Sequence, residues 1–151
     1  MPDFSRKFVY AIEAVLDIAY NSAGKPVQSS EISRRQEIPP RYLEPVLQQL
    51  VRQRVLTGVR GPRGGYRLAR NRSQISLGDI LRTVRSLETA DDPLAEAAGS
   101  DLGDNVVRPL CRTLRDEWMT RLDAVTFEDL CLQAHQGGVS SDALRTLDYS
   151  I

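Results

Sequence analysis

Apolar residues recur at helical spacing through the first third of this 151-residue chain. Ser5 is a suitable cap for a first helix that runs to about Ser22 and is stopped by Gly24. One stripe of that helix is apolar and consists of Phe8, Ile12, Val15, Leu16 and Ala19. Ser29 then predicts a second cap, followed by a short helix over about residues 30–36. Two helices joined by a short connection are therefore expected before residue 40.

A third helix and a change of period follow. Pro40 suits the first turn of a helix whose apolar face is formed by Tyr42, Leu43, Val46, Leu47 and Leu50. Pro45 lies inside this helix, where it removes a backbone hydrogen bond and favours a kink. Beyond it, Val55–Val59 and Tyr66–Ala69 are predicted as short strands around the segment RGPRGG. The pattern indicates a β-hairpin with a glycine- and proline-rich tip.

The second half of the chain is helical again. Ser76 and Asp79 resemble a capping box at the start of SLGDILRTVRSL. The acidic, small-residue stretch 88–105 is predicted as a linker, and an amphipathic helix begins near residue 105 or 109 and runs to about 124. Thr126 with Asp129 caps a last helix that ends at Gly137, and the tail from 138 is expected to be weakly structured.

The order helix, short helix, helix, hairpin, helix is that of a winged helix-turn-helix, so the fold class is mainly α with a β-hairpin wing. Residues 1–87 are expected to form the DNA-binding domain, and 88–105 an acidic linker or effector region. Residues 106–137 are expected to hold a long dimerisation helix and a short capping helix, and 138–151 a tail.

Composition restricts the surroundings and the partner. No run of about 18 apolar residues exists that could span a membrane, and Glu13 and Asp17 interrupt the N-terminal apolar stretch, which excludes a signal peptide. Two cysteines provide no disulfide framework and fit a reducing cytoplasm. Residues 1–85 hold 15 basic and 7 acidic residues, whereas 86–151 hold 5 and 13, so the halves carry +8 and −8. A basic half indicates a polyanionic partner.

The first turn of the third helix carries the candidates for reading bases in the major groove. Arg41 can pair bidentately with guanine, and Glu44 can accept a hydrogen bond from cytosine N4. Gln48 lies one turn further along the same face. Tyr42 stands beside them; its ring is expected to pack on the second helix, leaving its hydroxyl for a phosphate.

The hairpin tip has the properties of a minor-groove probe. Arg60 and Arg63 supply positive charge for a narrow minor groove, and the neighbouring glycines allow close backbone approach. Pro62 stiffens the tip and so reduces the entropy lost on docking. The phosphates beside the groove can accept Arg67, Arg70 and Arg72. DNA is therefore the predicted partner of this half of the chain.

The segments PVQSSEISRRQEIPPRYLEPVLQQL and VRGPRGGYRLAR resemble the IscR/NsrR/CymR group of bacterial transcription regulators, the Rrf2 family. The match runs almost without gaps from Phe8 to Leu87 and continues less sharply to VTFEDL. This resemblance implies a homodimer on an imperfect palindrome. It also implies base reading by Glu44 and minor-groove contact by Arg60.

By the same resemblance, Gly64, Gly65 and Tyr66 form the wing turn, and residues 106–124 form the dimerisation helix. The dimer stripe is expected to hold Val107, Leu110, Cys111, Leu114, Trp118 and Leu122. Lys7 is placed where the family has a phosphate-contacting residue, while Val9 replaces a usual arginine; Ser29 completes the predicted DNA-binding set. Arg54 stands where a tight turn often has glycine, and its side chain contacts a phosphate or faces solvent.

The chain departs from the family at the iron–sulfur site. The positions of the three cluster cysteines fall on Pro93, Gly99 and Asn105, and a histidine ligand of some members falls on Arg108. None of these supplies a thiolate, so no cluster, metal or other cofactor is predicted. The spacing of Cys111 indicates a packed core thiol, and Cys131 is interpreted in the same way. A cluster held by the two cysteines across a dimer is the less favoured alternative.

Two kinds of function remain after these observations. The first is a dimeric regulator of the repressor type that binds DNA and responds to a small molecule, a partner protein or oxidation of Cys111 and Cys131. The second is a winged-helix protein-interaction module that does not bind DNA. An enzyme is not expected, because the single histidine, His135, lies near a helix end where it suits a capping or solvent role.

Overall fold

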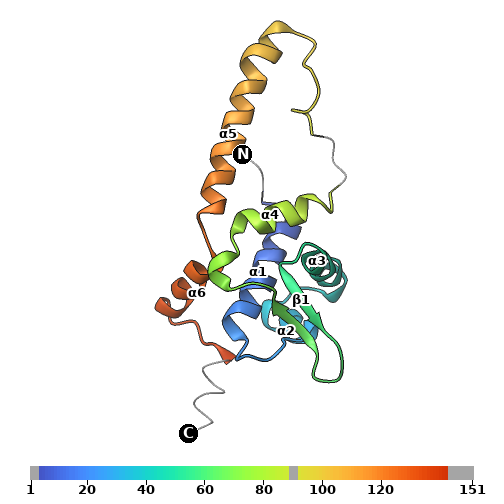
Figure 1. Cartoon of the computed structure of the whole chain (residues 1–151), viewed down its shortest axis with the longest axis vertical. Helices are drawn as coiled ribbons and strands as arrows, with labels where there is room; N and C mark the ends of the chain where they lie inside the picture. Colours follow the sequence, from blue (N-terminus) through green and yellow to red (C-terminus); the bar gives the residue numbers. More distant parts are fainter. Residues whose placement is uncertain (1–3, 89–91, 143–151) are drawn as a thin grey trace.

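The computed structural model describes residues 4–88 and 92–142. Its elements, in order, are α1 (Arg6–Asn21), α2 (Ser29–Gln36), α3 (Pro40–Arg52), β1 (Leu56–Val59), β2 (Gly65–Leu68), η1 (Arg72–Gln74), α4 (Leu77–Arg85), η2 (Gly103–Val107), α5 (Arg108–Asp123) and α6 (Phe127–Gln136). Figure 1 shows α1 at the centre, the hairpin and α3 on one side, and α5 projecting from the opposite end. In the described ranges, no helix combines the length and the apolar character needed to cross a membrane.

The helix α1 is the centre of the core. It packs against α2, α3, α4 and α6, so it is buried over a wider arc than one stripe. Phe8, Val15 and Ala19 of the predicted stripe are buried, and Ile12 and Leu16 pack partly against the core. The Ser5 hydroxyl accepts a hydrogen bond from the Phe8 amide, which confirms the predicted cap.

The helix-turn-helix differs from the prediction at its entry. The N-cap of α2 is Gln28, which makes no side-chain cap bond, and Ser29 is the first helical residue. The cap prediction for Ser29 is therefore wrong. The reason is that Val27 is held in extended backbone by pairing with the hairpin, which sets the start of the helix one residue earlier. The helix α3 begins at Pro40 as predicted and continues through Pro45.

The hairpin is part of a small three-stranded arrangement. Its two strands are antiparallel, with Leu56 opposite Leu68 and Val59 opposite Gly65. The Val27 amide donates to the Tyr66 carbonyl at 2.9 Å, and the Tyr66 amide donates to the Val27 carbonyl at 2.8 Å. Gly65 has φ +147°, and a Cβ there would lie 2.4 Å from the Val27 carbonyl oxygen. Glycine is thus required for this close approach.

Two capping boxes join the halves of the chain. Ser76 with Asp79 caps α4, and Thr126 with Asp129 caps α6, both as predicted. The two caps lie side by side, because the Leu77 amide donates to the Val125 carbonyl at 2.9 Å. The start of α6 is therefore fixed to the start of α4 in the basic half.

The long helix begins earlier than predicted. Residues 101–102 are already helical and lead through the π-helical segment η2 into α5. The Ser100 hydroxyl accepts from the Gly103 amide at 3.0 Å, so Ser100 caps this run. The predicted linker 88–105 consequently loses its last residues to the helix; residues 89–91 lie outside the described part.

The chain after α6 is more ordered than predicted, at least as far as residue 142. The Ser141 hydroxyl donates to the Tyr20 carbonyl at 2.6 Å, and the Asp142 amide donates to Asn21 Oδ1 at 3.0 Å. The Asp142 carboxylate accepts from Arg35 at 2.7 Å. Residues 139–142 therefore dock on α1 and α2. The rest of the predicted tail lies outside the described residues.

Candidate DNA interface

The outer face of α3 holds the predicted base-reading residues. Leu43, Val46, Leu47 and Leu50 are buried against the core, so the residues between them point outward. Arg41, Tyr42 and Gln48 are exposed, and Glu44 is half buried. The helical period of α3 thus places Arg41, Glu44 and Gln48 on one outward face. Tyr42, predicted on the apolar face, is 41% exposed at the edge of that face.

The Tyr42 ring lies near an aromatic side chain of α1. Its nearest aromatic neighbour is Tyr10 of α1, with 6.3 Å between the ring centroids. The Arg41 guanidinium carbon lies 4.8 Å from the centre of the Tyr42 ring, within the range of a cation–π contact. Tyr42 therefore orients Arg41 at the start of α3. Sequence reasoning missed Tyr10, which carried no signal beyond its place on a helix.

The wing stands directly beside the reading helix. Burial, and then the negative charge of Glu44, raise the pKa of Tyr66 above its ordinary value. Glu44 is thus close enough to act on Tyr66 electrostatically, and the phenol stays protonated as a hydrogen-bond donor. Gln28 Nε2 donates to the Pro62 carbonyl at 3.4 Å, which links the start of α2 to the wing tip. This role of Gln28 was not predicted.

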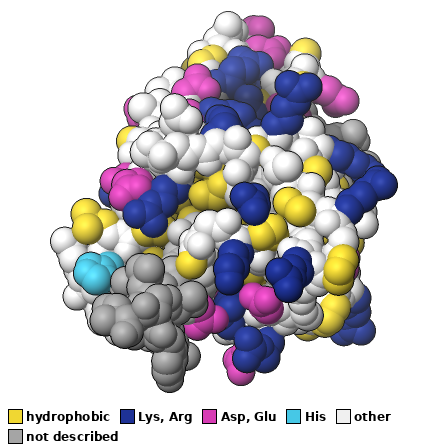
Figure 2. Space-filling model, turned by 60° about the horizontal axis from the view of Figure 1, so that its bottom comes forward, with side chains coloured by type: hydrophobic (Ala, Val, Ile, Leu, Met, Phe, Trp, Pro, Cys, Tyr) yellow, Lys and Arg dark blue, Asp and Glu magenta, His cyan; other side chains and the backbone are white. Residues whose placement is uncertain are grey.

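The wing tip itself is open to solvent. Arg60, Pro62 and Arg63 are exposed. A Cβ on Gly64 would lie 2.2 Å from the Val59 carbonyl oxygen, so the two arms of the loop touch through glycine. Figure 2 shows Lys and Arg side chains spread over the lower face of the molecule, with acidic groups between some of them. Lys7 of α1 is exposed and Ser29 is half buried.

The three basic residues after the wing have different surroundings. Arg67 is exposed on β2. Arg70 lies 3.7 Å from Asp79 in a loose ion pair. Arg72 is held by the Glu128 carboxylate of α6, and this hydrogen bond raises the pKa of its guanidinium. Arg72 therefore joins the two halves of the chain, and its predicted phosphate contact is not supported by this geometry.

The predicted dimer stripe divides into two parts. Val107, Leu110 and Leu114 are 51%, 56% and 54% exposed, although all three are apolar. Trp118 is half buried, and Leu122 lies in the core of its own chain at 5% exposure. The exposed apolar part is therefore the N-terminal two-thirds of the helix, with Val106 added at 56% exposure.

The two cysteines also differ. Cys131 is buried in the core, as predicted, and its burial raises the pKa of its thiol despite the nearby Arg72. Cys111 is only half buried and lines an open hollow beside α5. The prediction of a packed core thiol is wrong for Cys111 within the described chain, because α5 projects away from the body.

The family's iron–sulfur ligands do not fit this chain. Pro93, Gly99 and Asn105 offer no thiolate, and Arg108 uses its Nε to donate to the Glu96 carbonyl at 2.7 Å. Within residues 4–88 and 92–142, no three His, Cys, Asp or Glu side chains are grouped so that they could hold a metal ion.

A helix-turn-helix followed by a β-hairpin wing defines the winged helix-turn-helix class. Within that class the chain belongs to the Rrf2 family, because residues 4–133 match the family model, whose description is "iron-dependent transcriptional regulator". Among curated relatives are the HTH-type transcriptional regulators IscR of Escherichia coli O1:K1 / APEC and Cronobacter sakazakii. Each is 34% identical over 123 residues, covering 80% of this chain and 75% of the relative.

Solved structures agree with this assignment. IscR from T. potens superposes with a TM-score of 0.72 at 26% identity and covers 90% of both chains. CymR (YrzC), the global cysteine regulator of B. subtilis, superposes with a TM-score of 0.72 at 25% identity, covering 88% of this chain and 98% of that one. The chain is accordingly a transcriptional regulator of winged helix-turn-helix fold, and its relatives are regulators and not enzymes.

Proposed function

We propose that the protein binds an operator in double-stranded DNA as a homodimer and acts as a repressor in the cytoplasm. Each copy addresses one half of an imperfect palindrome. The helix α3 enters the major groove and the wing enters the adjacent minor groove. Repression is the simplest mode, because occupancy of the operator is sufficient to exclude other proteins.

The observation that carries the proposal is the joint between reading helix and wing. The two backbone hydrogen bonds between Val27 and Tyr66 fix the hairpin to the start of α2, and Glu44 of α3 lies near Tyr66. The base-reading and groove-entering side chains therefore form one surface, with little conformational entropy left to lose on docking. A protein-binding wing would have no need of its exposed arginines.

Each residue then has a chemical role. Arg41 is suited to guanine, and Glu44 to cytosine N4, with Gln48 further along the groove. Arg60 and Arg63 enter the minor groove, where the negative potential is enhanced. Phosphates are contacted by Lys7, Ser29 and the Tyr42 and Tyr66 hydroxyls, while Pro62, Gly64 and Gly65 set the shape of the tip.

Dimerisation is supported by the exposed apolar part of α5. Val106 and Val107 at the end of η2, with Leu110 and Leu114 of α5, are all more than half exposed, and a second copy of this helical run would remove them from water. Because α5 and the hairpin lie at opposite ends of the molecule (Figure 1), a pair joined through α5 leaves both wings free.

The test is selection of bound duplexes from a random DNA library. The protein is purified without oxygen, and its visible spectrum is recorded first. A palindrome recovered with colourless protein is the expected result. Failure to enrich any sequence would instead favour a protein-interaction module, and a brown sample would contradict the assignment of a regulator without a cluster.

Affinity for the selected duplex should fall steeply with salt, in proportion to the phosphates that the protein neutralises. An affinity independent of salt would argue against the proposed backbone contacts.

A further inference from the structure

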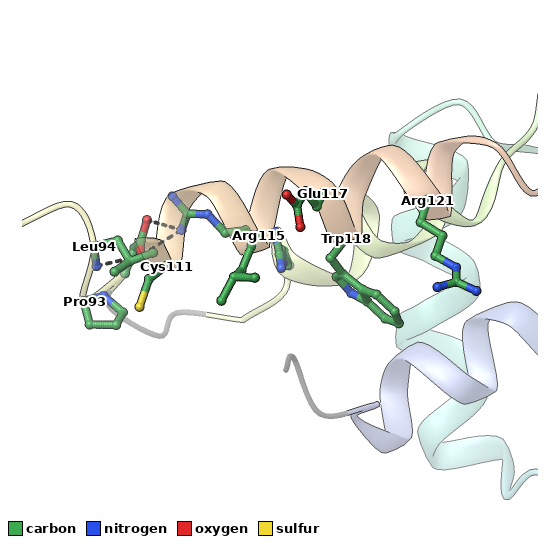
Figure 3. Close-up of a pocket in the computed structure, with 10 residues that line it drawn as sticks. Pro93, Leu94, Cys111, Arg115, Glu117, Trp118 and Arg121 are labelled. Carbon is green, nitrogen blue, oxygen red and sulfur yellow. Dashed lines mark hydrogen bonds and ion pairs between the residues drawn. The ribbon is translucent and has the colours of Figure 1, made fainter. Parts of the chain in front are cut away.

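A hollow of about 930 Å³ lies between the end of α4, the loop at 92–94 and α5, far from the wing. Figure 3 shows side chains of α5 and of this loop around it. We call it the α5 pocket. Its volume lies within the range of small-molecule sites in proteins, which is about 300–1,000 Å³.

The wall of the α5 pocket is largely apolar. Pro93 and Leu94 of the loop and Cys111, Leu114 and Trp118 of α5 line it. Figure 3 shows Pro93 and Leu94 beside Cys111, with Trp118 further along the helix. Trp118 Nε1 is buried and has no hydrogen-bond partner in the described chain. A buried donor without an acceptor is unfavourable, so a ligand acceptor that reached this atom would be bound more tightly.

The loop is held in place by three arginines along α5. Arg108 donates to the Glu96 carbonyl at 2.7 Å, and Arg112 donates to the Leu94 carbonyl at 2.9 Å. Arg115 pairs with Asp92 at 3.0 Å. The pocket wall is thus formed before any ligand binds, which lowers the entropy cost of binding.

The charges around the pocket favour an anion. Arg115 is already neutralised by Asp92. Arg85 and Arg121 also line the pocket, and neither forms a salt bridge with another described residue. The pKa of Asp92 is lowered first by its hydrogen bond with the Leu94 amide, then by Arg115 and also by Arg85, so Arg85 acts on this carboxylate from a longer distance. Glu117 is the one carboxylate of the lining besides Asp92. Arg85, Arg115 and Arg121 against Asp92 and Glu117 leave an excess of one positive charge beside an apolar wall.

We propose that the α5 pocket binds a small organic anion with an apolar body. The body packs against Leu94, Leu114 and Trp118, and the carboxylate or sulfonate of the ligand meets Arg85 and Arg121. The role of this ligand as a regulatory signal depends on the proposed function as a DNA-binding regulator. Binding itself is measured without DNA, so the two proposals fail separately.

A second copy of this chain is the competing occupant, because Cys111, Leu114 and Trp118 line the pocket and also belong to the predicted dimer stripe. The charges argue against it. If a second copy packs through its exposed apolar residues Val106, Val107 and Leu110, these residues bring no carboxylate to Arg85 and Arg121.

The experiment compares two probes with the same aromatic frame. These are 8-anilinonaphthalene-1-sulfonate, which is an anion, and N-phenyl-1-naphthylamine, which is neutral. Trp118 is the only tryptophan of the chain, so energy transfer from it reports a probe in this pocket. We expect one anionic probe per folded chain, bound about tenfold more tightly than the neutral one.

The double variant Arg85→Gln/Arg121→Gln should weaken the anionic probe about tenfold and leave the neutral probe unchanged. The single variants serve if the double variant does not fold by circular dichroism. Arg52→Gln, the same change at an exposed residue at the end of α3, is the control and should alter neither affinity. Equal affinity for both probes would overturn the proposal. The proposal would also be overturned if the probe bound only after dilution had dissociated the dimer, as seen from a smaller hydrodynamic size. In that case the second copy would be the occupant of the pocket.

Discussion

At the scale of single residues, Arg54 stands at a helix end where the left-handed backbone usually requires glycine. The end of α3 is a Schellman motif, in which the Arg54 amide donates to the Val51 carbonyl and the Val55 amide donates to the Leu50 carbonyl. Arg54 occupies the position of this motif where glycine is usual, and its φ is +60°. A side chain in this left-handed region costs about 1 kcal/mol.

We predict that Arg54→Gly raises the free energy of unfolding by about 0.5–1 kcal/mol, because relief of strain exceeds the added entropy of the unfolded chain. Urea denaturation measures it. The control is Gln53→Gly at the neighbouring position, where φ is −85° and glycine should lower stability. A loss of stability in both variants would mean that Arg54 forms compensating contacts.

Glu44 is the residue that tests base reading. Glu44→Ala should relax the preference at one base pair per half-site, because an acceptor for cytosine N4 is removed. Library selection on variant and parent gives the two binding profiles. Glu96→Ala, a carboxylate removed from an exposed loop away from α3, should leave the profile unchanged. Identical profiles for Glu44→Ala and the parent would refute the role.

At the scale of elements, the wing is one edge of a sheet whose third member is a single residue, Val27. This arrangement explains why two adjacent glycines are needed. Gly64 lies against the Val59 carbonyl, and Gly65 lies against the Val27 carbonyl. By contrast, a Cβ at Gly58 of β1 would meet nothing within 4 Å.

Gly65→Ala should therefore separate the wing from α2 and lower both DNA affinity and the thermal midpoint of unfolding, by about 1–3 kcal/mol in stability. Gly58→Ala, the matched change in the partner strand, should be tolerated. Calorimetry and a binding titration on the selected duplex measure the two effects. A stable Gly65→Ala protein with normal affinity would show that the Val27 pairing is dispensable.

Two arginines of the same region should behave differently. Arg60→Ala should weaken operator binding by about 1–3 kcal/mol, chiefly at A·T-rich flanks, without changing stability. Arg72→Ala should lower stability, because it removes the partner of Glu128, and should affect DNA binding less. Unchanged operator affinity in Arg60→Ala would remove the wing from the mechanism.

At the scale of the whole molecule, an ionic cluster joins α1, α2 and the segment after α6. The Asp17 side chain is fully buried and accepts from Arg35 and Gln36 at 2.7–2.9 Å. Arg35 also meets Asp142, and these contacts raise the pKa of its guanidinium. Segments from both ends of the chain thus meet at the helix-turn-helix.

Asp17→Asn should lower the free energy of unfolding by about 2–3 kcal/mol, because it leaves a largely buried guanidinium without its main partner. Asp142→Asn should cost about 0.5 kcal/mol, since the Asp142 side chain is 43% exposed. Denaturation of both variants under the same conditions gives the comparison. Equal losses would mean that the docked segment, and not Asp17, holds the cluster.

Short-range signals account for what could be predicted. The capping pairs Ser76–Asp79 and Thr126–Asp129 act over three residues, and the period of α3 decides which of its side chains face outward. The failures involve partners distant in sequence. The start of α2 differs from the prediction because Val27 pairs with Tyr66 of the hairpin. Arg72 forms a salt bridge with Glu128, and Asp142 forms one with Arg35. The cap formed by Ser100 was not predicted, because the residues around it have the composition of a linker.

The attachment of α5 has a mechanical consequence. The helical run from residue 101 to Asp123 is about 35 Å long at 1.5 Å per residue. Among the described residues, its packing on the body is concentrated in its C-terminal part, where Trp118 and Met119 pack against the core, Leu122 is buried and Asp123 pairs with Arg82 at 2.6 Å. That junction is the fulcrum of a lever. Turning it by about 5° would carry the far end through about 3 Å. In a pair of chains joined through these helices, the angle between each long helix and the body of its chain would therefore set the distance between the two DNA-binding surfaces.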